Sequence, residues 1–152
     1  MAEFNVFESV YEGIALDSVY GNIVSNNVFR IMTNRGISLW DNSDKNIVSN
    51  NRIYNSVVGA TGITTATGGG VTNDNNYIFN NYIENLATGI YIQGTNNTVK
   101  NNILLTCTTP INNAGTLTVI RNNEGFTEFG DLQINAGNIE MYNGTAWVII
   151  GP

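Results

Sequence analysis

Asn22-Ile-Val-Ser-Asn-Asn27 recurs unchanged 24 residues later as Asn46-Ile-Val-Ser-Asn-Asn51. Its shorter signature, an aliphatic residue followed three positions later by Asn, returns at Ile78 to Asn81, Val99 to Asn102 and Ile120 to Asn123, and Ala2 to Asn5 is a weaker copy. Repeats of 21 to 30 residues indicate stacked units, each unable to bury its apolar face alone.

A second landmark follows each Asn: an apolar residue two positions later, then a Gly-Ile pair at 13, 36, 62 and 89, with Pro110-Ile111 in the fifth place. After each pair, apolar and polar residues alternate, as in Ile14-Ala-Leu16 and Ile37-Ser-Leu39. This period of two is typical of strands, and no stretch shows the helical period of 3.6. The sequence therefore predicts an all-β fold, a right-handed parallel β-helix of about five coils over residues 1–125.

The repeated Asn is predicted to form a ladder inside this solenoid. Successive coils lie about 4.8 Å apart, so an inward Asn can bond the backbone of its own turn and the amide of the Asn in the next coil. The alternative is that Asn only marks loops. The predicted ladder consists of Asn5, Asn27, Asn51, Asn81, Asn102 and Asn123.

Residues 126–152 have a different pattern and are predicted to form a separate β hairpin or meander. Strands are expected at 132–135, 138–142 and 146–150, the last two joined by Asn143-Gly144, the preferred pair for a two-residue hairpin turn. So small a sheet needs another surface to cover its apolar side. It is expected to cap coil five or to join three chains into a homotrimer, through Ile139, Met141, Trp147 and Ile149.

Composition excludes several classes of function. A net charge of -6, with only six Lys and Arg, argues against nucleic acid, which is bound by clustered cations. Only 12% of the residues are charged, whereas 27 are Asn. The chain has no His and one Cys, which removes the commonest metal ligand and any internal disulfide. No cofactor, metal, membrane insertion or signal peptide is predicted.

Residues 2 to 125 resemble the right-handed parallel β-helix superfamily of pectin-lyase-like proteins, whose generic coil has the same Asn, apolar and Gly-Ile order. The resemblance implies the fold but not one activity, since the superfamily includes lyases, hydrolases, epimerases, periplasmic proteins and phage tail spikes. The ending Met141-Tyr-Asn-Gly-Thr-Ala-Trp-Val148 resembles the short aromatic hairpins that close phage tail and tail-fibre polypeptides.

Two outward columns on the strands after Gly-Ile are candidate sites. One contains Ala15, Ser38, Thr64 and Tyr91, and the other contains Asp17, Trp40, Ala66 and Gln93. Aromatic rings beside polar groups can hold a sugar, so Trp40, Tyr91 and Gln93 are candidate glycan contacts. Exposed Trp and Tyr are equally typical of subunit interfaces.

Hydrolysis of a glycan would require two carboxylates, and Asp17 and Asp41 fall nearly in register on adjacent coils. The alternative for Asp41 is a structural role at the start of the turn Asp41-Asn-Ser-Asp44. The other acidic residues are too scattered for the calcium cluster of lyases, and the Asp-Pro-His motif that the epimerases share is absent. Cys107 is expected to be a small buried apolar residue.

The favoured hypothesis is a structural or adhesive segment of a phage tail spike or tail fibre, in the virion or extracellular, that contacts host glycan. The rivals are a carbohydrate-active β-helix enzyme, either hydrolase or lyase, and an excised or engineered repeat module. Coil one is already under way at Ala2, which suggests a longer parent protein or a partner on the first rung. The longer third repeat is expected to form a loop within residues 61–76.

Overall fold

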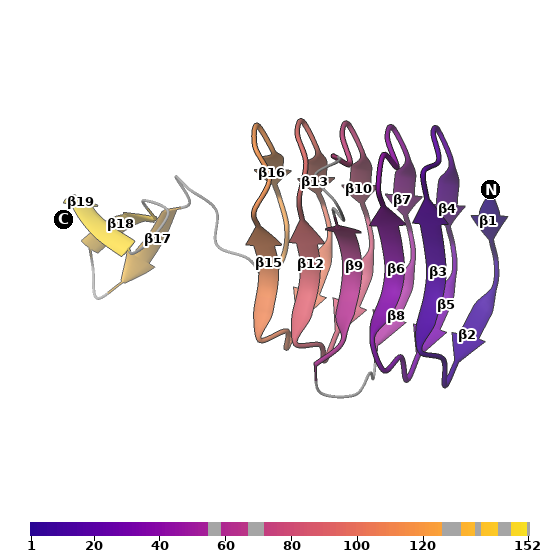
Figure 1. The fold of residues 1–152 in the computed structure, drawn as a ribbon. Coiled ribbons are helices and arrows are strands. Elements are labelled where there is room, and N and C mark those ends of the chain that lie inside the picture. The colour runs from indigo at the N-terminus through magenta and orange to yellow at the C-terminus, as the bar shows by residue number, and fades with distance from the viewer. Residues whose placement is uncertain (55–58, 67–71, 126–131, 136–137, 143–146, 152) are drawn as a thin grey trace.

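The repeats form three parallel sheets that wrap into a solenoid, as the computed structural model of the chain shows (Figure 1). It describes residues 1–152 except 55–58, 67–71, 126–131, 136–137, 143–146 and 152, and the side chains of 132–151 are also outside the described part. No helix occurs among the described residues. The predicted all-β solenoid of about five coils is confirmed.

Each of the first five coils contributes one strand to each sheet, and β16 adds a sixth strand to the first sheet. The first sheet has the order β1 (Ala2–Glu3), β4 (Ile23–Ser25), β7 (Ile47–Ser49), β10 (Tyr77–Phe79), β13 (Thr98–Lys100) and β16 (Val119–Arg121). The second contains β2 (Val6–Glu8), β5 (Val28–Arg30), β8 (Arg52–Tyr54), β11 (Tyr82–Glu84) and β14 (Ile103–Leu105). The third contains β3 (Glu12–Asp17), β6 (Arg35–Trp40), β9 (Thr61–Ala66), β12 (Thr88–Ile92) and β15 (Thr109–Asn113).

The centre residue of each short strand points inward and stacks on its counterpart in the next coil. In the first sheet this column runs through Val24, Val48, Ile78 and Val99, all buried. In the second sheet the rings of Phe7 and Phe29 stack with 4.9 Å between their centres. Burying such columns removes apolar surface from water at about 25 cal/mol per Å², so the stacking of coils supplies the core that one coil lacks.

The ladder asparagines occupy the corner between the first and second sheets. Asn27 donates from its backbone N–H and from Nδ2 to Oδ1 of Asn51, both at 3.0 Å. The same pair of bonds recurs from Asn5 to Asn27, from Asn51 to Asn81, from Asn81 to Asn102 and from Asn102 to Asn123. Nδ2 of the buried members also donates to backbone carbonyls, such as that of Val24 for Asn51. Each amide thus bonds buried backbone groups of the corner as well as the Asn of the next coil.

A second ladder, which the repeat analysis missed, lies on the other side of the first sheet. Backbone N–H groups of Asn22, Asn46 and Asn76 donate to the Oδ1 atoms of Asn46, Asn76 and Asn97 at 2.8 to 2.9 Å. The next position in this column is Thr118, whose buried Oγ1 has no hydrogen-bond partner. The first Asn of the unchanged repeat, Asn22 in one copy and Asn46 in the other, could have predicted this second ladder.

The corners explain why so many other residues are Asn. The tight turns contain residues with a positive φ, and at the first corner these are Phe4, Asn26, Asn50, Asn80, Asn101 and Asn122, with φ between 54° and 57°. Asn tolerates this left-handed region better than other non-glycine residues. The third corner has Asn75 and Asn96 but ends in Leu117, with φ 51°.

The glycine of each Gly-Ile pair is required by close approach between coils. A Cβ on Gly36 would lie 2.7 Å from the carbonyl oxygen of Gly62 and 3.1 Å from Cγ2 of Ile53. A Cβ on Gly62 would lie 2.6 Å from the carbonyl oxygen of Gly89. Only a residue without a side chain fits where the strand passes so near the next rung.

The extra residues of coil three are divided between two places rather than gathered in one loop. Eight positions separate Phe29 from Ile37, but ten separate the aligned Ile53 from Ile63. Seven positions separate Leu39 from Asn46, but eleven separate the aligned Thr65 from Asn76. Residues 61–66, which the sequence placed in the loop, form β9 in register with both neighbouring strands.

The C-terminal segment forms an antiparallel three-stranded sheet of β17 (Leu132–Asn135), β18 (Asn138–Tyr142) and β19 (Trp147–Gly151). Tyr142 pairs with Trp147, which fits the predicted hairpin, although the turn residues Asn143 and Gly144 lie outside the described residues. The side chains of Ile139, Met141, Trp147 and Ile149 lie outside them as well. The homotrimer therefore stays a prediction.

Candidate functional site

The third sheet carries the residues that the sequence proposed for glycan contact and catalysis. Its register aligns Ala15 with Ser38, Thr64 and Tyr91, and aligns Asp17 with Trp40 and Ala66. Gln93 follows directly after Ile92, which pairs with Thr65. Trp40 and Tyr91 stand two rungs apart in different columns, and both are half-buried. Their role in glycan contact stays a prediction.

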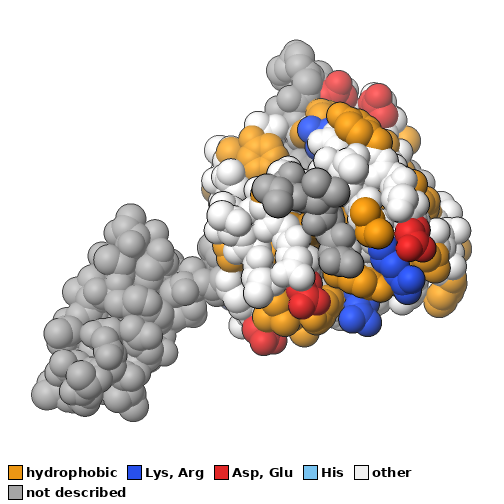
Figure 2. Space-filling model, turned by 90° about the horizontal axis from the view of Figure 1, so that it is seen from below, with side chains coloured by type: hydrophobic (Ala, Val, Ile, Leu, Met, Phe, Trp, Pro, Cys, Tyr) orange, Lys and Arg blue, Asp and Glu red, His pale blue; other side chains and the backbone are white. Residues whose placement is uncertain are grey.

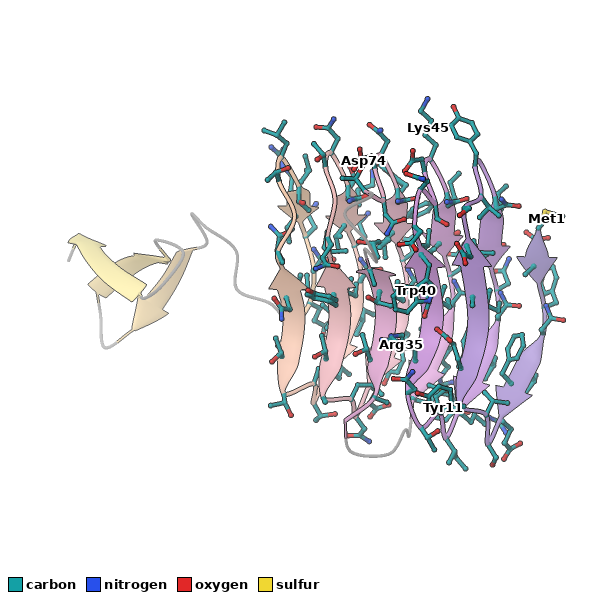
Figure 3. All side chains as sticks on the ribbon, in the orientation of Figure 1. Met1, Tyr11, Arg35, Trp40, Lys45 and Asp74 are labelled. Carbon is teal, nitrogen blue, oxygen red and sulfur yellow. The ribbon has the colours of Figure 1, made fainter. Side chains whose placement is uncertain are left out.

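The two columns are less exposed than the outward alternation predicted. Ser38 and Thr64 are fully buried and Ala66 is buried. The Arg35 guanidinium stacks over the ring of Trp40 on the same strand, with Cζ 4.6 Å from the ring centre, as the labelled side chains of Figure 3 show. The Ser38 hydroxyl donates to Oε1 of Glu12. Outward strand position and solvent exposure are therefore different properties on this face.

The proposed catalytic carboxylates occupy different positions in the coil. Asp17 aligns with Trp40, the last residue of β6. Asp41 therefore lies one residue beyond the end of that strand, with φ 28°. Asp17 is exposed and its Oδ1 accepts a hydrogen bond at 2.9 Å from the hydroxyl of Ser18. The pairing of Asp17 with Asp41 in catalysis stays a prediction.

Cations lying on aromatic rings recur on the outer faces. Five of the six Lys and Arg side chains of the chain lie over a ring. They are Arg30, Arg35, Lys45, Arg52 and Lys100, over Tyr54, Trp40, Tyr20, Tyr54 and Tyr77 respectively. Lys45 Nζ also donates to the Tyr20 hydroxyl at 2.7 Å, and this bond raises the pKa of Lys45.

The second sheet carries the longest run of such contacts. Arg30 lies over Tyr54 with Cζ 5.7 Å from the ring centre, and Arg52 lies between two rings, 4.8 Å from Tyr54 and 5.2 Å from Tyr82. We call Arg30, Arg52, Tyr54 and Tyr82 the arginine–tyrosine patch. The sequence analysis missed it, but aligning the repeats on the ladder Asn places Arg52 and Tyr82 at one position and Arg30 and Tyr54 at another.

Acidic residues border the patch. The Tyr82 hydroxyl donates to Oε2 of Glu84 at 2.9 Å, and this bond raises the pKa of Tyr82. Glu8 is the register neighbour of Arg30 on the first coil. Seen from below the view of Figure 1, acidic and basic side chains stand among hydrophobic ones (Figure 2).

Groups able to bind a soft metal are few and separated. Cys107 is half-buried against the core, and its thiol contacts the carbonyl oxygens of Leu105 at 3.6 Å and Ile83 at 4.0 Å. Burial raises the pKa of the Cys107 thiol. Met32 is fully buried in the core. In the described part of the chain, no three His, Cys, Asp or Glu residues are grouped so as to hold a metal ion.

Comparison with known proteins gives one significant result. The family model described as periplasmic copper-binding protein (NosD) matches residues 1–139. No curated protein and no solved structure matches significantly. The described residues contain no helix long and apolar enough to cross a membrane.

This result corrects the functional prediction. The prediction of a phage tail-spike or tail-fibre segment in a virion is wrong, because the matching family is described as periplasmic. The resemblance of the C-terminal hairpin to phage proteins has no support from the comparison. The matching family is described as copper-binding, so the rivals, the carbohydrate-active enzyme and the excised or engineered module, gain no support from the comparison either. The match covers the whole solenoid, and the chain belongs to the NosD family of periplasmic copper-binding proteins.

Proposed function

We propose that this chain has a NosD-like role in the periplasm as a rigid scaffold that docks another protein, and that its described residues do not themselves hold copper. The observation that carries the proposal is the donor set. Proteins bind copper through imidazole nitrogen and through Cys or Met sulfur, and these groups would have to converge on one point of the solenoid.

The residues present do not fit a copper ion. The chain has no His. Cys107 directs its thiol at two backbone carbonyls, and Met32 is enclosed by the core. Met1 is exposed at the opposite end of the solenoid from Cys107. No described pair of sulfur atoms is presented to one site, so copper chemistry has no first coordination shell among these residues.

A docking role is supported by the nature of the outer faces. The Asn ladders tie successive coils together through buried amides, which favours a stiff frame. On that frame, Tyr, Trp and Arg are held in mutual contact at the surface. These three residue types are the ones enriched where proteins bind one another.

The test is a competition for Cu(I) between the full chain and bicinchoninate, monitored by the absorbance of the copper–chelator complex. The expected result is that the protein removes no stoichiometric copper and that its melting temperature is unchanged by added Cu(I). Cys107→Ser and Met141→Leu variants serve as controls, the latter because the Met141 side chain lies outside the described residues. Removal of one copper per chain, lost in either variant, would overturn the proposal.

A further inference from the structure

We propose that the arginine–tyrosine patch on the second sheet is a docking site for an acidic polypeptide segment of a partner protein. This inference deepens the proposed docking function by naming the surface and the chemistry of the partner. It depends on four side chains whose mutual positions follow from the register of β5, β8 and β11.

Arg52 is the centre of the patch because its charge has no carboxylate beside it along the sheet. Its register neighbours are Val28 on one side and Tyr82 on the other, and its side chain is exposed. The guanidinium lies between two rings, at 4.8 and 5.2 Å from their centres. A planar guanidinium fixed in this way loses little freedom when it takes a carboxylate in a bidentate pair.

Arg30 gives a second, independent indication, because its side chain has a donor without a hydrogen-bond acceptor. Its Nε is buried and has no hydrogen-bond partner, although Glu8 is its register neighbour. A buried donor without an acceptor costs about 1–3 kcal/mol. A carboxylate that draws the Arg30 guanidinium out towards Arg52 would free this buried Nε to find an acceptor and offset that cost.

Arg52 is the charge of the patch that has no acidic register neighbour. Glu84 is the register neighbour of Tyr54, but its carboxylate already accepts the hydrogen bond from Tyr82. Ile103 lies one rung beyond Tyr82, and Glu124 forms an isolated bridge with Ile103 one rung further on. Both acids lie on the far side of the rings from Arg30, whereas Glu8 is its direct register neighbour on the first coil. Arg52 is therefore the residue that offers an accessible positive charge.

The frame of the patch favours a polypeptide over a glycan. Apolar side chains flank the column of Arg52 and Tyr82, with Val28 before it and Ile103 after it, whereas Glu8 and Glu84 flank the other column. A polysaccharide presents hydroxyl groups that would be desolvated against these residues at a cost. Aromatic and arginine anchors within an apolar frame are typical of protein hot spots.

The test uses a fluorescein-labelled, acetylated peptide of alternating Glu and Val residues, titrated with the full chain while fluorescence anisotropy is measured. Arg52→Gln is expected to weaken binding about tenfold or more, the effect of removing a hot-spot arginine. Arg52→Lys keeps the charge but not the planar stack, and an intermediate loss is expected. A peptide with Lys in place of Glu should not bind.

The matched control is Arg121→Gln, because Arg121 is exposed on the first sheet and its loss changes the net charge equally. Its affinity should stay within about twofold of the wild type. Equal weakening by both Gln variants would reduce the effect to general electrostatics and overturn the inference, as would absence of peptide binding. Binding of polygalacturonate but not of the peptide would assign the patch to a glycan instead.

The two proposals fail in different ways. Copper removal from the chelator would overturn the proposed function, whether or not the peptide binds. Loss of peptide binding with the copper result intact would remove only the inference about this patch. Urea unfolding of each variant, followed by circular dichroism, checks that the solenoid is intact before its binding is compared.

Discussion

Asn27 directs two donors, its backbone N–H and its Nδ2, at the single Oδ1 of Asn51, and both distances are 3.0 Å. Asn51 repeats the arrangement towards Asn81. Oδ1 of one Asn therefore accepts hydrogen bonds from both the backbone N–H and the side-chain amide of the Asn in the preceding coil. The same arrangement repeats along the solenoid. The stability of each coil depends on its neighbours through this contact.

Replacing Asn51 by the similarly sized Leu should lower the free energy of unfolding by about 2–4 kcal/mol, because the buried N–H of Asn27 and a backbone carbonyl lose their partners. Urea denaturation followed by circular dichroism measures the change. Asn5→Leu, at the more exposed first rung, is the control and should cost less than about 1 kcal/mol. Equal losses at the two positions would contradict a buried-amide origin.

Thr118→Asn should stabilise the chain by about 1 kcal/mol. The substitution continues the second ladder, because a side-chain oxygen at this position can accept from the backbone of Asn97, as Asn97 accepts from Asn76. It also removes the unpartnered Oγ1 of Thr118. The midpoint of urea unfolding should rise, and Thr118→Val, which only deletes the unpaired hydroxyl, separates the two contributions. A gain from Val as large as that from Asn would refute the ladder explanation.

Leu117→Asn should stabilise the chain by about 0.5–1 kcal/mol, because Leu117 has φ 51° and is 77% exposed, and a branched residue in the left-handed region is strained. Thermal unfolding measures the effect. Val119→Asn makes a comparable polar change on a neighbouring strand residue that has no positive φ, so no gain is expected there. A gain at both sites would point to lost surface hydrophobicity instead.

Cys107 should react slowly with a thiol reagent such as Ellman's reagent near pH 8. Burial raises the pKa of its thiol, so less thiolate, the reactive form, is present than in an unfolded chain at the same pH. The rate should rise when urea unfolds the solenoid. The same shift lowers the free energy of unfolding as the pH rises from the pKa of this thiol in the unfolded chain to its higher pKa in the folded chain. In that range the unfolded chain has already lost the proton that the native state still holds. Reaction at the rate of the unfolded chain would show that Cys107 is not shielded.

Much of the fold could be predicted because it is periodic in the chain. The interval between Val24 and Val48 is the length of one coil, and the same apolar residue must return at the same inward place. Only the distribution of the extra residues in coil three was wrong. Its length shows in the interval from Asn51 to Asn81, but where a strand ends inside that interval depends on pairing with β6 and β12.

The surface was less predictable. Ser38 and Thr64 alternate correctly with inward residues yet are fully buried, and the Ser38 hydroxyl donates to Glu12 of the neighbouring coil. The pairing of Arg52 with Tyr82 joins residues 30 positions apart. Neither local propensity nor alternation carries that information.

By itself, the sequence determined the number of coils, the parallel register, the first Asn ladder and the strands of the C-terminal sheet, since each repeats or alternates along the chain and obeys local chemistry. Only the tertiary structure decided which outward residues are solvent-exposed, which cations lie on which rings, and that Cys107 and Met32 are separated. These depend on side chains brought together from different coils. The strength of these contacts depends on distances between side chains of different coils, and the sequence of one strand does not give those distances.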